Sequence, residues 1–71
     1  MTEKELKTLL TMRPFAPFRL HFSSGTSHDV THPDGMIVNG RMAAVAVGDS
    51  LWFVALIHIV EVEPLPAVSA S

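Results

Sequence analysis

The spacing of hydrophobic residues changes once along the chain, from the period of a helix to the alternation of a strand. Near the N-terminus, three leucines recur at i, i+3 and i+4, the spacing of one helix face: Leu6, Leu9 and Leu10. From Phe18 onward, apolar and polar residues alternate, which is the pattern of a half-buried strand. We therefore expect one short amphipathic helix packed on a sheet that the rest of the chain forms.

Capping residues and a proline set the two ends of this helix. Thr2 followed by Glu5 fits a capping box, which predicts that the helix begins at about Glu3. Pro14 disfavours helical backbone in the residue before it, so the helix should end near Met12. The proline-containing connector that follows leads into the first strand.

Turn residues divide the remainder into short strands. Gly25 can adopt a positive φ in a tight turn, and the His-Pro-Asp-Gly run at 32–35 interrupts the alternation. Asn39 and Gly40 form the strongest two-residue hairpin signal in the chain. The expected strands are residues 18–22, 27–31, 36–38, 41–47 and the segment 51–63.

The last segment is too long for one strand of ordinary length. It is apolar on both faces at first and alternates cleanly only towards Glu61 and Glu63, so we expect a break or sharp bend at 55–58. The fold class is thus mainly β (α+β): an N-terminal helix followed by a strongly bent antiparallel sheet of about five strands, a small barrel. Residues 1–63 form a single domain, and residues 64–71 are expected to be a disordered tail.

Composition adds a second expectation, because the chain is rich in apolar residues for its size. Apolar residues make up 48% of the 71 positions and charged residues 17%, a surplus that one small core does not accommodate. We expect the surplus to form an interface with identical copies, or with another protein. The candidate interface residues lie in the apolar segment: Trp52, Val54 and Leu56.

The N-terminal residues, the length of the longest apolar run and the absence of cysteine lead us to expect a cytoplasmic location. The charged start of the chain does not resemble a secretory signal, and the longest apolar run is far shorter than a membrane span. There is no cysteine, which excludes disulfides and thiolate metal sites. We therefore expect a soluble cytoplasmic protein with no membrane partner.

Several motifs together resemble a group of small uncharacterised bacterial proteins. The motifs are the run Leu-Leu-Thr-Met-Arg-Pro-Phe-Ala-Pro-Phe at 9–18, Gly25, His32-Pro33, and the closing Ile-His-Ile-Val-Glu-Val-Glu at 57–63. Members of this group share a leading helix, a Pro-Phe-x-Pro-Phe motif and a His-Pro turn. The resemblance covers residues 3–63 and implies no particular activity.

A second, weaker resemblance is architectural. A helix followed by five short strands, with a brief bend between the last two, is similar to the Sm-like proteins, which include a bacterial RNA chaperone. This resemblance implies a bent barrel that joins neighbouring copies edge to edge. Sm-like RNA sites use basic and aromatic residues at the pore and rim, whereas the bend at 55–58 offers only His58.

Candidate catalytic and metal sites are weak. Ser27, His28 and Asp29 are consecutive, so on a strand they alternate between faces and form no relay. His28 and His32 lie too far apart along an extended segment to share one metal, which leaves only a site shared between subunits open. We expect no catalytic residues, no cofactor and no metal within one chain, and hence not an enzyme.

The nearest approach to a nucleic-acid site is a set of basic residues near two phenylalanines: Arg13, Arg19, His21 and His58. A net charge of −2 offers no general attraction to phosphate backbones. The favoured hypothesis is a non-enzymatic small-barrel module that acts by self-association or protein binding. The alternative is an Sm-like protein that binds RNA or single-stranded nucleic acid.

Overall fold

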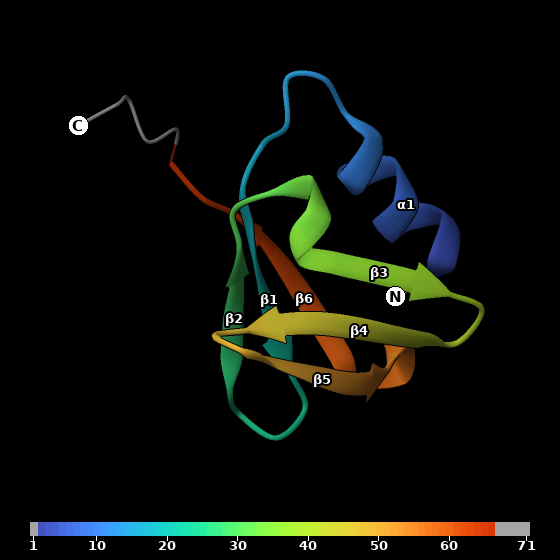
Figure 1. The fold of residues 1–71 in the computed structure, drawn as a ribbon. Helices are drawn as coiled ribbons and strands as arrows, with labels where there is room; N and C mark the ends of the chain where they lie inside the picture. Colours follow the sequence, from blue (N-terminus) through green and yellow to red (C-terminus); the bar gives the residue numbers. More distant parts are fainter. Residues whose placement is uncertain (1, 67–71) are drawn as a thin grey trace.

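Two three-stranded antiparallel sheets and one helix make up the fold (Figure 1). The computed structural model describes residues 2–66. The helix is α1 (Glu3–Thr11). The first sheet has the order β2-β1-β6, formed by β1 (Phe18–Phe22), β2 (Ser27–Val30) and β6 (Ile59–Pro64). The second has the order β3-β4-β5, formed by β3 (Met36–Asn39), β4 (Met42–Val47) and β5 (Ser50–Ala55).

The chain passes between the two sheets at two short 3₁₀ turns. The turn η1 (Pro33–Gly35) joins β2 to β3, and η2 (Leu56–His58) joins β5 to β6. The η2 turn confirms the predicted break at 55–58. The expected single bent sheet of about five strands is replaced by two sheets of three strands each, because η1 interrupts the strand pairing as well. Figure 1 shows the strands of the first sheet running across those of the second.

The capping box predicted for the helix start is present. The Glu5 backbone N–H donates to Thr2 Oγ1 at 3.2 Å, and the Thr2 backbone N–H donates to Glu5 Oε1 at 3.0 Å. The helix ends at Thr11, one residue before the predicted Met12. It packs against β3 and η1. Leu6 is its only fully buried residue, and Leu9 and Leu10 of the predicted stripe are partly buried against the core.

The core lies between the two sheets and under the helix. Its members are all apolar: Leu6, Phe18, Leu20, Val30, Met36, Val38, Ala43, Val45, Leu56 and Ile59. In β1, Phe18 and Leu20 are buried, which confirms the alternation predicted from Phe18 onward. In β4, every second residue at the centre is buried as well, namely Ala43 and Val45. No polar or charged side chain is buried in the described part of the chain.

The C-terminal boundary of the folded unit lies further along than predicted. Pro64 is the last residue of β6 and pairs opposite Phe18. The backbone N–H of Leu65 donates to the carbonyl oxygen of Pro17 at 3.0 Å. Residues 64 and 65 thus belong to the folded unit. Pro66 follows them as an exposed residue outside the strand, and the rest of the predicted tail, residues 67–71, lies outside the described residues.

The hairpin between β3 and β4 is shifted by one residue from its predicted position. Asn39 pairs with Met42, so the two-residue loop is Gly40-Arg41 rather than Asn39-Gly40. Gly40 has a φ of +64°, in the left-handed region that β-branched residues adopt only with strain.

Replacing Gly40 by Val should therefore destabilise the fold by about 1–3 kcal/mol. Replacing Ser24 by Val is the matched control, because Ser24 lies in an exposed turn without a positive φ. Melting temperatures from circular dichroism measure both. Equal melting temperatures for the two variants would contradict the backbone geometry of this loop.

Candidate protein-interaction surface

The two sheets present outer faces of opposite character. The outer face of the first sheet carries paired charged groups, with Arg19 opposite Asp29 on β2 and Glu63 on β6. The outer face of the second sheet consists of the residues that alternate with its buried rows: Ile37, Asn39, Met42, Ala44, Ala46, Leu51, Phe53 and Ala55. None of these eight residues is charged. We call this second set the apolar face.

Strand register aligns the apolar face into rows across the sheet. Ile37, Ala44 and Phe53 are direct neighbours on β3, β4 and β5. Ile37 is 66% exposed and Phe53 is 72% exposed, so large apolar side chains stand in solvent at both ends of this row. A contiguous exposed apolar patch of this kind is a mark of an interaction site.

The candidate interface residues predicted from the sequence lie mostly on the other side of β5. Trp52 and Val54 alternate with the residues of the apolar face, so they point towards the inner side of the sheet. Trp52 is nevertheless 60% exposed, because β5 is an edge strand and none of its residues is fully buried. Leu56 is only 4% exposed and belongs to the core. Leu56 is therefore not part of the exposed surface of this chain.

Three exposed residues of the apolar face were not predicted from the sequence to lie in an interface: Ile37, Met42 and Phe53. The signal that could have identified them is the alternation itself. Once the row containing Ala43 and Val45 is placed inward, its neighbours must point outward. Their apolar character then marks that outer face.

A groove of about 440 Å³ borders β5 on its free side. It is lined by the turn after β1, by β5 and by η2: Phe22, Ser23, Ser24, Thr26, Trp52, Phe53, Val54 and His58. Apart from His58, its side chains are apolar or carry only hydroxyl groups. The groove therefore extends the uncharged surface from the apolar face around the edge of the sheet.

The strand β5 is also the least protected edge of the two sheets in the described residues. The edge strand β2 is four residues long and carries Asp29, and β3 lies against α1. The edge strand β6 carries Glu61 and Glu63 and pairs with β1 through an irregular register. These features discourage edge pairing, and β5 has none of them: it is six residues long, regular and uncharged.

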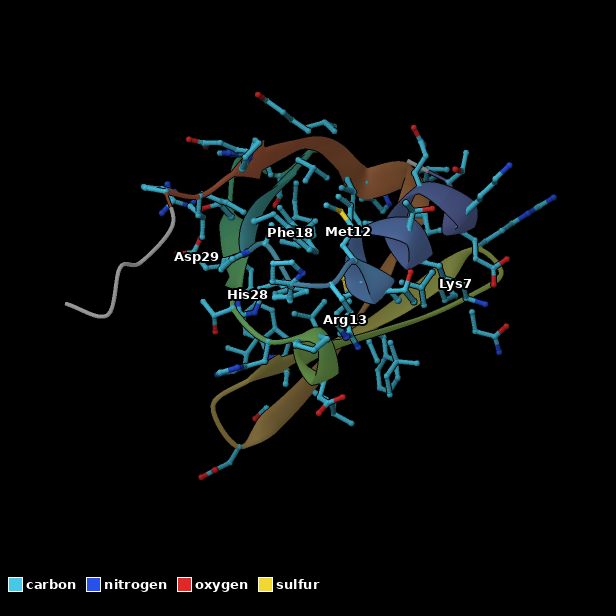
Figure 2. All side chains as sticks on the ribbon, turned by 90° about the horizontal axis from the view of Figure 1, so that it is seen from above. Lys7, Met12, Arg13, Phe18, His28 and Asp29 are labelled. Atoms are coloured by element: carbon cyan, nitrogen blue, oxygen red, sulfur yellow. The ribbon has the colours of Figure 1, made fainter. Side chains whose placement is uncertain are left out.

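The basic residues proposed for nucleic-acid binding are not gathered into one patch. Arg13 lies before β1 and donates from Nη1 to the carbonyl oxygens of Met12 at 2.8 Å and Leu10 at 3.2 Å. His58 lies past the other end of β1, where Nδ1 is 3.1 Å from the Ser23 hydroxyl oxygen. Figure 2 shows Arg13 beside the end of the helix and Asp29 on a separate strand.

The two remaining basic residues are paired with carboxylates. Arg19 donates to Asp29 through Nε at 2.6 Å and through Nη2 at 3.3 Å. This hydrogen-bonded guanidinium holds the pKa of the Asp29 carboxyl below its usual range. His21 Nε2 is 2.8 Å from Glu63 Oε1. Each of these two basic groups thus faces a carboxylate that competes with phosphate for it.

The candidate catalytic run at 27–29 does not form a relay in the described residues. Ser27 and Asp29 are on one face of β2 and His28 is on the other, as the alternation predicts. Within residues 2–66, no three His, Asp or Glu side chains lie close enough to hold one metal ion.

The single α-helix of the described chain has nine residues, which is too short to cross a membrane. Comparisons of the whole sequence with protein-family models and with curated proteins found no match, and a search of solved structures also found none. The apolar face, the groove and the open edge of β5 are therefore the features from which a function can be argued.

Proposed function

We propose that this protein is a non-enzymatic module that acts by self-association, with the apolar face and the edge of β5 as its interaction surface. The observation that carries the proposal is the row formed by Ile37, Ala44 and Phe53, which exposes two large apolar side chains and includes no charge. Burial of such a surface contributes about 25 cal/mol per Å² of apolar area. Binding is therefore favourable wherever a complementary apolar surface is available.

The size of the domain favours a partner of its own kind. A stable interface covers about 800 Å² per partner, which is about one sixth of the 4958 Å² that this chain exposes. Identical copies supply the same apolar face at the concentration of the protein itself, and most homo-oligomers close by rotational symmetry. Another protein with an apolar surface would occupy the same residues, and a homo-oligomer is the occupant that we favour.

An Sm-like architecture and a cytoplasmic location belong to the same proposal. In support of the architecture, a helix precedes the strands, and a 3₁₀ turn separates the last two, β5 and β6. The described strands form two open sheets, so the likeness concerns strand order and the position of the break rather than a closed barrel. The absence of cysteine supports a reducing compartment such as the cytoplasm.

Nucleic-acid binding is the alternative function, and the ion pairs of the first sheet argue against it. Arg19 and His21 are engaged by Asp29 and Glu63, and the net charge of the chain is −2. Binding of single-stranded RNA that weakens as salt is raised would favour this alternative. We expect no such binding.

Mass in solution tests the proposed function. Light scattering at micromolar concentration should give a multiple of the 7.7 kDa chain mass. Replacing Phe53 by Asp should reduce the mass to one chain, because a buried interface would hold an unpaired carboxylate. Replacing Val60 by Asp is the control, since Val60 is 63% exposed on β6, outside the apolar face.

A mass of one chain for the unaltered protein would contradict self-association. A Phe53→Asp variant that keeps the full mass would contradict the placement of the interface on the apolar face. Melting curves of both Asp variants should show cooperative unfolding, which separates loss of association from loss of folding.

A further inference from the structure

The apolar face has an alternating pattern of large and small side chains. Ala44 on β4 is paired with Phe53 on β5, and Ala46 is paired with Leu51. At the next position the order is reversed, with the large Met42 on β4 and the small Ala55 on β5. In each of the three cross-strand pairs, one large side chain therefore stands beside an alanine.

This pattern is complementary to itself under one particular rotation. Consider a two-fold axis in the plane of the interface, running along the strands midway between β4 and β5. The rotation places β5 of one copy over β4 of the other without shifting residues along the strands. In each of these three β4–β5 pairs, the large side chain of one copy then meets the alanine of the same pair in the other copy.

We infer that a second copy of this chain packs face to face on the apolar face about this axis. Phe53 of each copy rests on Ala44 of the other, Leu51 rests on Ala46, and Met42 rests on Ala55. The inference rests on the proposed function and names its partner and its geometry. Sheets that pack face to face lie about 10 Å apart, a gap that one large side chain fills when it faces a small one.

The charged groups on the outer face of the first sheet exclude that face as the surface that packs on the apolar face. A second copy that docked through its first sheet would bring Arg19, Glu61 and Glu63 against the apolar face. Burying those groups away from water and against apolar partners is unfavourable. Of the two outer sheet faces formed by the described residues, only the apolar face carries no charge. The apolar face of a second copy is therefore the surface that complements it.

Exchange of the large and small partners tests this packing. Ala44→Phe places two phenylalanines against each other and should weaken association at least about tenfold by sedimentation equilibrium. Phe53→Ala leaves an unfilled gap and should also weaken association about tenfold or more. The double variant Ala44→Phe/Phe53→Ala exchanges the two sizes and should recover association to within about threefold of the unaltered chain.

Two further measurements keep the outcomes distinct. Val60→Ala, on the other sheet, is the matched surface control and should leave the dissociation constant unchanged. Circular dichroism melts of Ala44→Phe should show a folded chain, since Ala44 points outward and a larger side chain there meets no core residue.

The unaltered protein should have a mass of two chains. If it has the mass of one, the proposed function fails together with this inference. If it associates but Ala44→Phe has no effect, or the double variant gains nothing over the single variants, face-to-face packing is overturned and self-association stands. Pairing of β5 edges would produce that second result, because it leaves Ala44 uncovered.

Discussion

Replacing Leu56 by Asp is expected to unfold the domain. Leu56 is 4% exposed at the start of η2, where its backbone N–H donates to the Arg41 carbonyl oxygen at 2.8 Å. A carboxylate there would be buried among apolar side chains without a partner, at a cost of several kcal/mol. At about 0.05–0.15 kcal/mol per residue, a domain of this size has only about 4–11 kcal/mol of stability in total.

The neighbouring residue provides a sharp control for this prediction. Ile57 is 79% exposed, so Ile57→Asp should change the free energy of unfolding by no more than about 0.5 kcal/mol. Circular dichroism at one protein concentration measures both variants. A Leu56→Asp protein that melts like the unaltered chain would show that Leu56 is not part of the core.

Replacing Leu6 by Ala is expected to cost about 2–5 kcal/mol of unfolding free energy. Leu6 is 0% exposed and is the only fully buried residue of α1, while Leu9 and Leu10 are partly buried against the core, so Leu6 makes the largest contribution to the attachment of the helix. A nine-residue helix is too short to be stable without that attachment. The helical signal at 222 nm should therefore fall at a lower denaturant concentration than in the unaltered chain.

Lys7→Ala is the control on the same helix. Lys7 is exposed and forms an ion pair with Glu3 at 2.8 Å, an i,i+4 pair of a type that contributes about 0.3–0.5 kcal/mol. Its removal should shift the urea midpoint only slightly. Comparable midpoints for Leu6→Ala and Lys7→Ala would mean that the helix is held by something other than Leu6.

Local features of the fold could be predicted from the sequence because local chemistry determines them. The helix start depends on Thr2 and Glu5, which bond to each other's backbone within one turn. The inward rows of β1 and β4 follow from strand alternation, which needs only neighbouring residues. The break at η2 followed from the change of pattern within 51–63.

The division into two sheets could not be predicted in the same way. Pairing of β1 with β6 joins residues such as Leu20 and Val62, which are far apart in the sequence. The role of η1 as a second crossing point depends on that distant pairing. Alternation within a strand identifies its two faces, but it does not identify its neighbours.

The apolar segment after residue 50 supplies both the interface residues predicted from the sequence and part of the apolar face. The prediction used the even-numbered row of this segment, whereas the apolar face contains the odd-numbered row of β5. Leu56 was included because strand alternation was continued through the break. The 3₁₀ turn η2 resets that alternation and directs Leu56 into the core.

The strand pairings also imply an order of folding. The second sheet is assembled entirely by neighbouring hairpins, from Met36 to Ala55, so it closes through short loops with little loss of chain entropy. The first sheet needs β6 to pair with β1, which joins Phe18 to Pro64 across most of the chain. Phe18 and Leu20 therefore gain their final cover only when the last strand has docked. Pairing of β6 with β1 is thus the long-range step that completes the first sheet, whereas the apolar face needs only the two local pairings among β3, β4 and β5.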